Sequence, residues 1–186
     1  MKFHASCVLL ASIVASTAWS ADFKLTSTDV GPDRGLALDF VFNGYGCTGG
    51  NHSPALAWSG APTGTLSYAL TLFDPDAMQG KGFWHWLMFN IPATTTSLSR
   101  DAGKNDGSKA PTGAVQTKNG FRTLGYGGSC PPTSDEPHGY VFTVYALKVA
   151  KLDVSASAPP TAVLDAIEVS SLGKATLRYQ FGRGPK

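Results

Sequence analysis

Two short stretches of the sequence carry side chains that can bind a polar ligand or exchange protons with it. The first contains the turn Asp74-Pro75-Asp76 and then His85. The second contains the segment 127–132 and then His138 and Tyr140. Carboxylates and imidazoles in this combination can carry out acid–base chemistry or orient a ligand. The two histidines lie far apart in the chain, so only the fold can bring them together.

Each stretch also has an ordinary structural interpretation. Asp-Pro commonly starts a turn, and in this interpretation Asp74 only shapes the chain. His85 stands between two tryptophans, where a packed ring is common. A glycine-rich segment is by itself most often a plain turn. Its successive N–H groups, at Gly128, Ser129 and Cys130, can alternatively form an anion-binding concavity.

Apolar runs predict the elements that must position these side chains. Strands are expected over residues 36–42, 66–73, 86–91, 140–147 and 175–181. The second, third and fourth of these runs are apolar on both alternating faces, as in strands covered on both sides in the middle of a sheet. One good helix candidate follows Pro159-Pro160, and Gly173 is expected to end it.

If strands 66–73 and 86–91 are antiparallel neighbours, the first stretch lies at one edge of their sheet. The turn between them then presents Asp74, Asp76 and His85 together. Asp74 directly follows strand 66–73 and His85 directly precedes strand 86–91, which predicts this arrangement.

The second stretch offers the opposite wall. His138 and Tyr140 stand two residues apart where strand 140–147 begins, so they share one face. They place a ring nitrogen and a phenol beside the glycine-rich segment. We therefore interpret the two stretches as two walls of one small pocket.

The first residues have the pattern of an export signal. Lys2 supplies a positive start, residues 8–15 are apolar, and Ala18-Trp19-Ser20 fits a small-x-small cleavage site. Residues 1–20 are therefore expected to be a signal peptide and residues 21–186 a single domain, periplasmic or secreted. No later run is long and apolar enough to predict a membrane span.

Composition narrows the class of protein. Glycine and proline are frequent, at 21 and 12 residues, and only 15% of residues are charged, which favours a turn-rich, mostly β protein. The net charge is only +2, without a basic stripe, so no nucleic-acid partner is expected.

Two cysteines remain after removal of the signal peptide, Cys47 and Cys130. An even number of cysteines in an exported chain favours a disulfide. The bridge would close a long loop, which typically stabilises a protein by about 2–5 kcal/mol. The alternative is a pair of buried free thiols.

Beyond these patterns, the chain resembles the phosphatidylethanolamine-binding protein (PEBP) or Raf-kinase-inhibitor-like family, and most closely its bacterial YbhB/YbcL branch. Three motifs in the family's order carry the resemblance. They are Asn51-His52-Ser53-Pro54-Ala55-Leu56-Ala57-Trp58, then Asp74-Pro75-Asp76 with His85 and Asn90, and finally Gly128-Ser129-Cys130-Pro131-Pro132 with His138-Gly139-Tyr140. Two departures are Met78, where the family usually has proline, and the lack of an obvious equivalent of the eukaryotic C-terminal helix.

The resemblance implies a mostly β (α+β) fold with an antiparallel β-sandwich core and a few peripheral helices. It also implies a pocket for small anions such as phosphate and phosphorylated head groups. The ligand-binding residues carried over are Asp74, His85, Gly128, Pro132, His138 and Tyr140.

Three functions follow from these residues and from the resemblance. The leading expectation is an exported binding protein for a small anion or phosphorylated head group, without enzyme activity, cofactor or metal. A second is a modulator of a protein target, such as a protease, a kinase or a host protein. A third is a weak hydrolase that uses Asp74, His85 and His138, although the sequence has no Gly-x-Ser-x-Gly or His-Glu-x-x-His motif.

Overall fold

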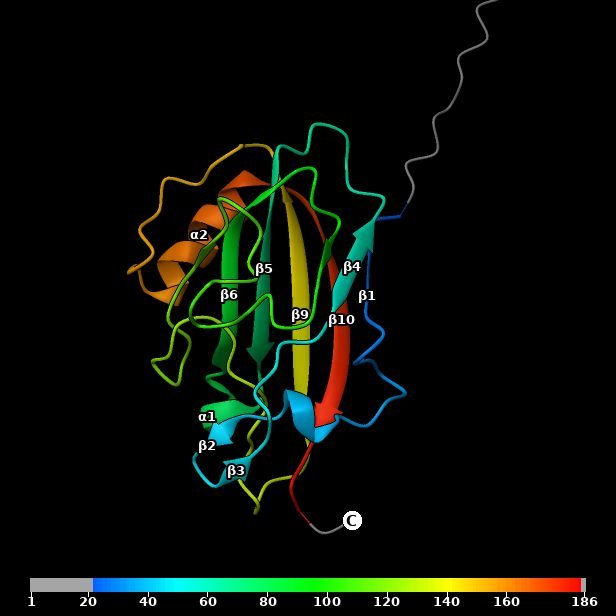
Figure 1. The fold of residues 1–186 in the computed structure, drawn as a ribbon, viewed down its shortest axis with the longest axis vertical. Coiled ribbons are helices and arrows are strands. Elements are labelled where there is room, and N and C mark those ends of the chain that lie inside the picture. The colour runs from blue at the N-terminus through cyan, green and yellow to red at the C-terminus, as the bar shows by residue number, and fades with distance from the viewer. Residues whose placement is uncertain (1–21, 185–186) are drawn as a thin grey trace, which may run out of the picture.

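The computed structural model describes residues 22–184 (Figure 1). Antiparallel sheets form the body of this part of the chain, and one helix, the longest, packs against an outer face. The strands are β1 (Lys24–Thr26), β2 (Asn43–Gly44), β3 (Cys47–Thr48), β4 (Leu56–Ser59), β5 (Ser67–Asp74), β6 (Phe83–Pro92), β7 (Ser97–Leu98), β8 (Val115–Gln116), β9 (His138–Leu147) and β10 (Ser171–Phe181). The helices are the 3-10 helix η1 (Leu38–Phe40), α1 (Ala77–Gly80) and α2 (Pro160–Ser170). The expected signal peptide, residues 1–20, lies outside the described residues.

The main sheet has five strands in the order β10-β9-β5-β6-β8, and a smaller sheet has the order β1-β4-β7. Every strand pair within both sheets is antiparallel. The three strands that were predicted to be central, β5, β6 and β9, lie in the middle of the main sheet (Figure 1). The expected mostly β, antiparallel sandwich with few helices is therefore confirmed.

Both faces of the central strands are covered, as their continuous apolar sequence predicted. One face packs against the small sheet, where Trp58 of β4 joins Leu70 and Met88 in one hydrophobic cluster. The other face packs against α2, which buries Val163 and Ile167 completely. Each large apolar side chain buried in this way contributes roughly 1.5–3 kcal/mol relative to exposure.

Helix α2 ends earlier than the sequence predicted. The helix begins at Pro160, because proline fits the first turn of a helix. It stops at Ser170, and Ser171 already pairs with Leu147 of β9 as the first residue of β10. Gly173 lies inside β10 next to a register shift, so the prediction that Gly173 ends the helix is wrong.

The predicted strand over residues 36–42 is also wrong. Residues 38–40 form η1, and the backbone is held by the loop that follows instead of by a sheet. The N–H groups of Gly50 and His52 donate to the carbonyl oxygens of Leu38 and Asp39. Leu38 and Asp39 are exposed whereas the next three residues are all buried, which is not the alternation of a half-buried strand.

The predicted disulfide between Cys47 and Cys130 is confirmed, with the two Cα atoms 6.1 Å apart. It joins the β2–β3 hairpin to the glycine- and proline-rich segment 127–132. The bridge therefore connects the β2–β3 hairpin to one of the two stretches that were predicted to form walls of the pocket.

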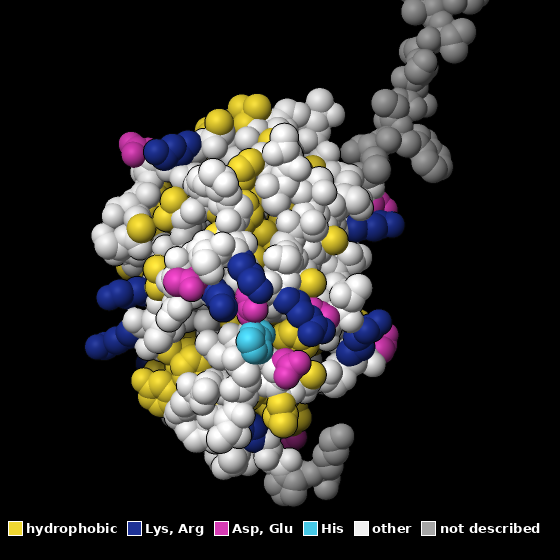
Figure 2. All heavy atoms as spheres, in the orientation of Figure 1, with side chains coloured by type: hydrophobic (Ala, Val, Ile, Leu, Met, Phe, Trp, Pro, Cys, Tyr) yellow, Lys and Arg dark blue, Asp and Glu magenta, His cyan; other side chains and the backbone are white. Residues whose placement is uncertain are grey.

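Two further features bear on possible partners. Among residues 22–184, no helix is long and apolar enough to cross a membrane. On the face shown in Figure 2, Lys and Arg side chains are interspersed with Asp and Glu instead of forming one basic stripe. That face therefore lacks the electrostatic pattern that is typical of nucleic-acid binding.

Candidate functional site

His85 is aimed by a β-bulge in β6. Leu72 of β5 pairs with Trp86, while the next residue, Phe73, pairs with Trp84, so His85 is the extra residue between them. Bulges of this kind bend a strand and redirect a side chain, often beside functional sites. The prediction that the strand starts after His85 is therefore wrong, because β6 already begins at Phe83.

The ring of His85 is neutral and presents an acceptor to the pocket. Its Nδ1 lies 2.8 Å from the carbonyl oxygen of Gly127, which can only accept, so Nδ1 carries the hydrogen and Nε2 the lone pair. Burial disfavours the cation and lowers the pKa of His85 to about 4. Nε2 lies 4.0 Å from Oδ2 of Asp74, too far for a hydrogen bond.

Asp74, the last residue of β5, stabilises the turn that follows it and also accepts a hydrogen bond from a histidine of the site. Its Oδ1 accepts the backbone N–H groups of Asp76 and Ala77, at 2.9 and 3.0 Å. Its Oδ2 accepts Nδ1–H of His138 at 2.8 Å. Asp76 is close by and accepts the N–H of Gly139 at 2.7 Å. Asp74 therefore stabilises the turn, as the turn interpretation predicts, and also holds His138, while its part in ligand binding stays a prediction.

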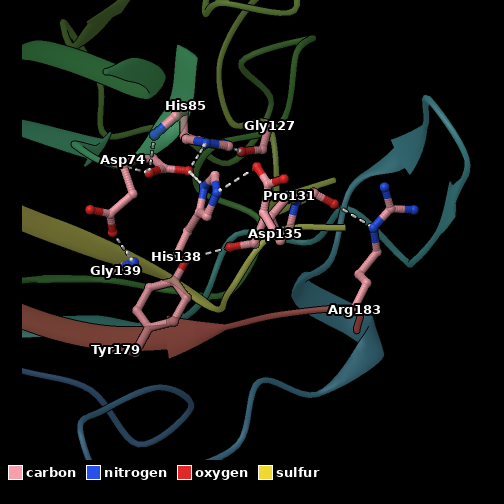
Figure 3. Close-up of polar contacts among 12 residues, drawn as sticks. Asp74, His85, Gly127, Pro131, Asp135, His138, Gly139, Tyr179 and Arg183 are labelled. Atoms are coloured by element: carbon pink, nitrogen blue, oxygen red, sulfur yellow. Dashed lines mark hydrogen bonds and ion pairs between the residues drawn. The ribbon is translucent and has the colours of Figure 1, made fainter. Parts of the chain in front are cut away.

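His138, the first residue of β9, lies between two carboxylates (Figure 3). Nδ1 contacts Asp74, and Nε2 lies 3.4 Å from Oδ2 of Asp135. Burial opposes protonation of the ring, but the hydrogen bond and charge of Asp74, with a smaller contribution from Asp135, outweigh it and raise the pKa of His138. The site thus combines a neutral histidine, His85, with a histidine that favours the cation.

Tyr140 supplies a buried donor two residues farther along β9. The side chain is fully buried, and within residues 22–184 its hydroxyl has no hydrogen-bond partner. Burial raises the pKa of Tyr140, so the phenol stays protonated. Its ring meets the ring of His85 edge-on, with the centroids 5.2 Å apart.

These groups form the floor of a cavity of about 470 Å³. This volume lies at the lower end of the range for small-molecule sites. Apolar and aromatic side chains form the walls. The lining residues are Tyr45, Asp74, Ala77, Met78, Phe83, His85, Gly120, Phe121, Cys130, Pro131, Pro132, Asp135, His138, Tyr140 and Arg183.

Met78 explains one departure from the family motif. Met78 and the following Gln79 have φ angles of 54° and 58°, in the left-handed region. The proline ring fixes φ near −65°, so proline is incompatible with this conformation of Met78. The turn at the cavity rim must therefore differ from that of relatives with proline here.

Five of the six predicted ligand-binding residues line the cavity, namely Asp74, His85, Pro132, His138 and Tyr140. Gly128 does not line it. The N–H of Gly128 donates to Oδ1 of Asn51 at 2.8 Å, so it is not free for an anion as expected. A Cβ atom at Gly128 would lie 2.3 Å from the carbonyl oxygen of Phe40, which explains the glycine by close backbone approach.

Sequence reasoning missed the outer part of the site. Asp135 and Arg183 contribute charge, and the rings of Tyr45, Phe83 and Phe121 contribute apolar wall. These residues come from five separate segments and share no motif. Only the connection through the disulfide indicated that the segment around Tyr45 belongs to this site.

Comparison with known proteins decides the family. The phosphatidylethanolamine-binding protein family model matches residues 26–182. The chain belongs to the phosphatidylethanolamine-binding protein family. This membership confirms the resemblance inferred from the three motifs. The matched residues include all strands except most of β1, and every lining residue of the PEBP pocket except Arg183.

Individual PEBP relatives support the same branch. YbcL of Escherichia coli K12 is 50% identical over 146 residues, which cover 78% of this chain and 80% of YbcL. YbhB of the same organism is 40% identical over 158 residues, which cover 85% of this chain and 99% of YbhB.

Solved structures of PEBP-family proteins have a fold similar to that of this chain. The crystal structure of E. coli YbcL, described as a new member of the mammalian PEBP family, matches with a TM-score of 0.84 at 46% identity, over 87% of this chain and 99% of that one. The PEBP homologue CT736 of Chlamydia trachomatis matches with a TM-score of 0.69 at 26% identity, over 86% of this chain and 96% of that one.

Proposed function

We propose that this PEBP-family protein binds a phosphorylated head group, or another small phosphate-bearing anion, in the cavity floored by Asp74, His85, His138 and Tyr140. The observation that carries the proposal is that the hydroxyl of Tyr140, which has no hydrogen-bond partner within residues 22–184, belongs to the same cavity as His138, whose pKa is raised in favour of the cation. A buried donor without a partner is unfavourable unless a ligand or water satisfies it.

The hydrogen-bonding pattern of the floor fits a monoprotonated phosphate. Nε2–H of His138 and the hydroxyl of Tyr140 donate to phosphate oxygens. Nε2 of His85 carries a lone pair and accepts the P–OH hydrogen, which a fully ionised anion lacks. The three groups thus distinguish a protonated phosphate from an anion that can only accept.

Two carboxylates at the floor would repel an anion, and each is compensated differently. Asp74 is buried and accepts Nδ1–H of His138, whose protonated form compensates the charge of the carboxylate. The Asp135 side chain is 44% exposed and holds Nε2 of His138 only at 3.4 Å. A ligand phosphate can therefore take this weakly held donor while the Asp135 carboxylate turns to solvent.

The walls fit the remainder of a head-group ligand. Phe83 and Phe121 pack at a centroid distance of 4.7 Å, and Tyr45 lies beside Phe121 at 5.6 Å. Tyr45 and Met78 are largely exposed at the rim, at 76% and 66%. The walls therefore favour the apolar parts of a ligand whose phosphate lies at the floor.

We further propose that the ligand is bound without turnover. Among the lining residues Cys130 is held in the disulfide, and no serine, threonine or lysine is present. Tyr140 remains protonated because burial raises its pKa. The cavity thus offers no serine, threonine, lysine or free cysteine as a nucleophile. Export to the periplasm or medium is part of this proposal and agrees with the Cys47–Cys130 disulfide. A role as modulator of a protein target stays a prediction.

Calorimetric titration of inorganic phosphate and phosphoethanolamine into oxidised residues 21–186 tests the proposal. We expect saturable binding of both, and at least tenfold weaker binding by His138→Ala, which loses a charged donor. His52→Ala is the matched control, because His52 is exposed and lies outside the cavity. Equal affinities of both variants, or ³¹P NMR evidence that a phosphomonoester is hydrolysed, would contradict the proposal.

A further inference from the structure

Arg183 carries a fixed charge that pairs with no acidic side chain among residues 22–184. Its Nε donates to the carbonyl oxygen of Pro131 at 2.5 Å, and Nη1 donates to that of Gly46 at 2.9 Å. None of the ion pairs found within residues 22–184 includes Arg183. Two carbonyl groups therefore hold the guanidinium in place without cancelling its charge.

The register of the last strand places Arg183 at the cavity. Phe181 pairs with His138, so the chain continues past the start of β9 and along the segment that precedes it. Arg183 is one of the cavity-lining residues. Figure 3 shows it on the other side of Pro131 and Asp135 from Asp74, so the floor and Arg183 form two separate ends of the site.

The charges of the lining residues show what Arg183 adds. The carboxylates of Asp74 and Asp135 face one histidine whose pKa is raised in favour of the cation, His138, because His85 is neutral. Arg183 is the one lysine or arginine among the described lining residues. Arg183 therefore adds the one permanent positive charge to a described lining that holds two carboxylates.

The guanidinium retains donors for a ligand. Two of its nitrogens each make one hydrogen bond to a carbonyl, and the remaining N–H groups have no partner within residues 22–184. A guanidinium fork suits the planar geometry of a carboxylate and the oxygens of a phosphate. Prior fixation by Pro131 and Gly46 reduces the ordering that a ligand must induce.

We propose that Arg183 binds a second anionic group of the ligand and makes the cavity selective for phosphorylated compounds that carry such a group. This inference rests on the proposed function, with the phosphate at the His138 floor. It predicts that O-phosphoserine binds better than phosphoethanolamine, because the two compounds differ only by the carboxylate.

Calorimetry of O-phosphoserine and phosphoethanolamine with oxidised residues 21–186 tests the selectivity. We expect O-phosphoserine to bind about tenfold more tightly to the wild type, the effect of one charged hydrogen bond. In Arg183→Gln the ratio of the two affinities should fall to about one, and Arg183→Lys should restore part of it. Arg178→Gln, an exposed arginine of β10 outside the cavity, should keep the full ratio.

The outcomes separate this inference from the proposed function. Equal binding of both compounds by the wild type, with inorganic phosphate still bound, would overturn only the role of Arg183. Failure of the wild type to bind any of the three compounds would overturn both. Equal weakening of both compounds in Arg183→Gln would show that Arg183 only secures the β2–β3 hairpin, and would also overturn the inference.

Discussion

His138 donates Nδ1–H to Oδ2 of Asp74 across 2.8 Å, and this contact joins the start of β9 to the end of β5. Both side chains are almost fully buried, at 7% and 3% exposure. The contact fixes the ring so that its second nitrogen faces Asp135 at the cavity. It also raises the pKa of His138, because the carboxylate stabilises the cation against the effect of burial.

The substitution Asp74→Asn tests this relationship. The amide keeps an oxygen for the N–H groups of Asp76 and Ala77 but removes the charge that supports the His138 cation. We expect phosphate to bind about tenfold more weakly at pH 7.5, with partial recovery at pH 5.5 as His138 becomes protonated. Tighter binding by calorimetry at pH 7.5 would mean that Asp74 only repels the ligand.

The substitution Asp135→Asn should have the opposite effect. Asp135 competes with the ligand for Nε2 of His138 and contributes little to fixing the ring. Removal of its charge should therefore strengthen phosphate binding a few-fold at low ionic strength. The same titration checks this, and weaker binding would show that Asp135 orients the histidine.

His85 should make the protein less stable in acid. Its pKa is about 4 in the folded protein against 6.5 for the free residue. Between pH 6.5 and 4 the unfolded chain binds a proton that the folded protein cannot hold, so the free energy of unfolding falls as pH falls, by up to roughly 3 kcal/mol. The raised pKa of His138 adds little here, because both states are protonated below pH 6.5.

Urea denaturation between pH 7 and 4 measures this dependence. His85→Gln should have a shallower loss of stability with falling pH than the wild type, whatever its stability at pH 7. His52→Gln is the control; it removes the exposed contact with Asp101 and should keep the steep loss of stability that His85 causes. Parallel curves for the wild type and His85→Gln would contradict the account of His85.

Helix α2 should be structural, because Ile167 is completely buried against the main sheet. Ile167→Asp would bury an unpaired charge and should lower the free energy of unfolding by several kcal/mol. Val169→Asp, on the same helix at a position that is 76% exposed, should change it little. An unchanged urea midpoint for Ile167→Asp would show that this face does not support the core.

The sequence predicted the parts of the structure that depend on local patterns. Strands β5, β6 and β9 are apolar on both faces, and only the middle of a covered sheet accommodates such strands. The disulfide followed from the even cysteine count. The floor residues followed from motifs whose order matched the family.

Features that depend on long-range backbone contacts were not predicted. Residues 38–40 turn away from a strand because the loop at Gly50 and His52 satisfies the carbonyl groups of residues 38 and 39. Gly128 is a site of close approach to Phe40 instead of an anion donor. The position of Arg183 depends on the register of β10 against β9, which no local pattern specifies.

NMR of the histidine side chains during titration with phosphoethanolamine tests the central claim most directly. The protein carries its own control, because His52 lies outside the cavity whereas His85 and His138 line it. We predict saturable shifts of the ¹H and ¹⁵N ring signals of His138 and His85, with the His52 signals unchanged. Saturation at His52 alone, or no saturable shift at His138, would contradict a phosphate site at this floor.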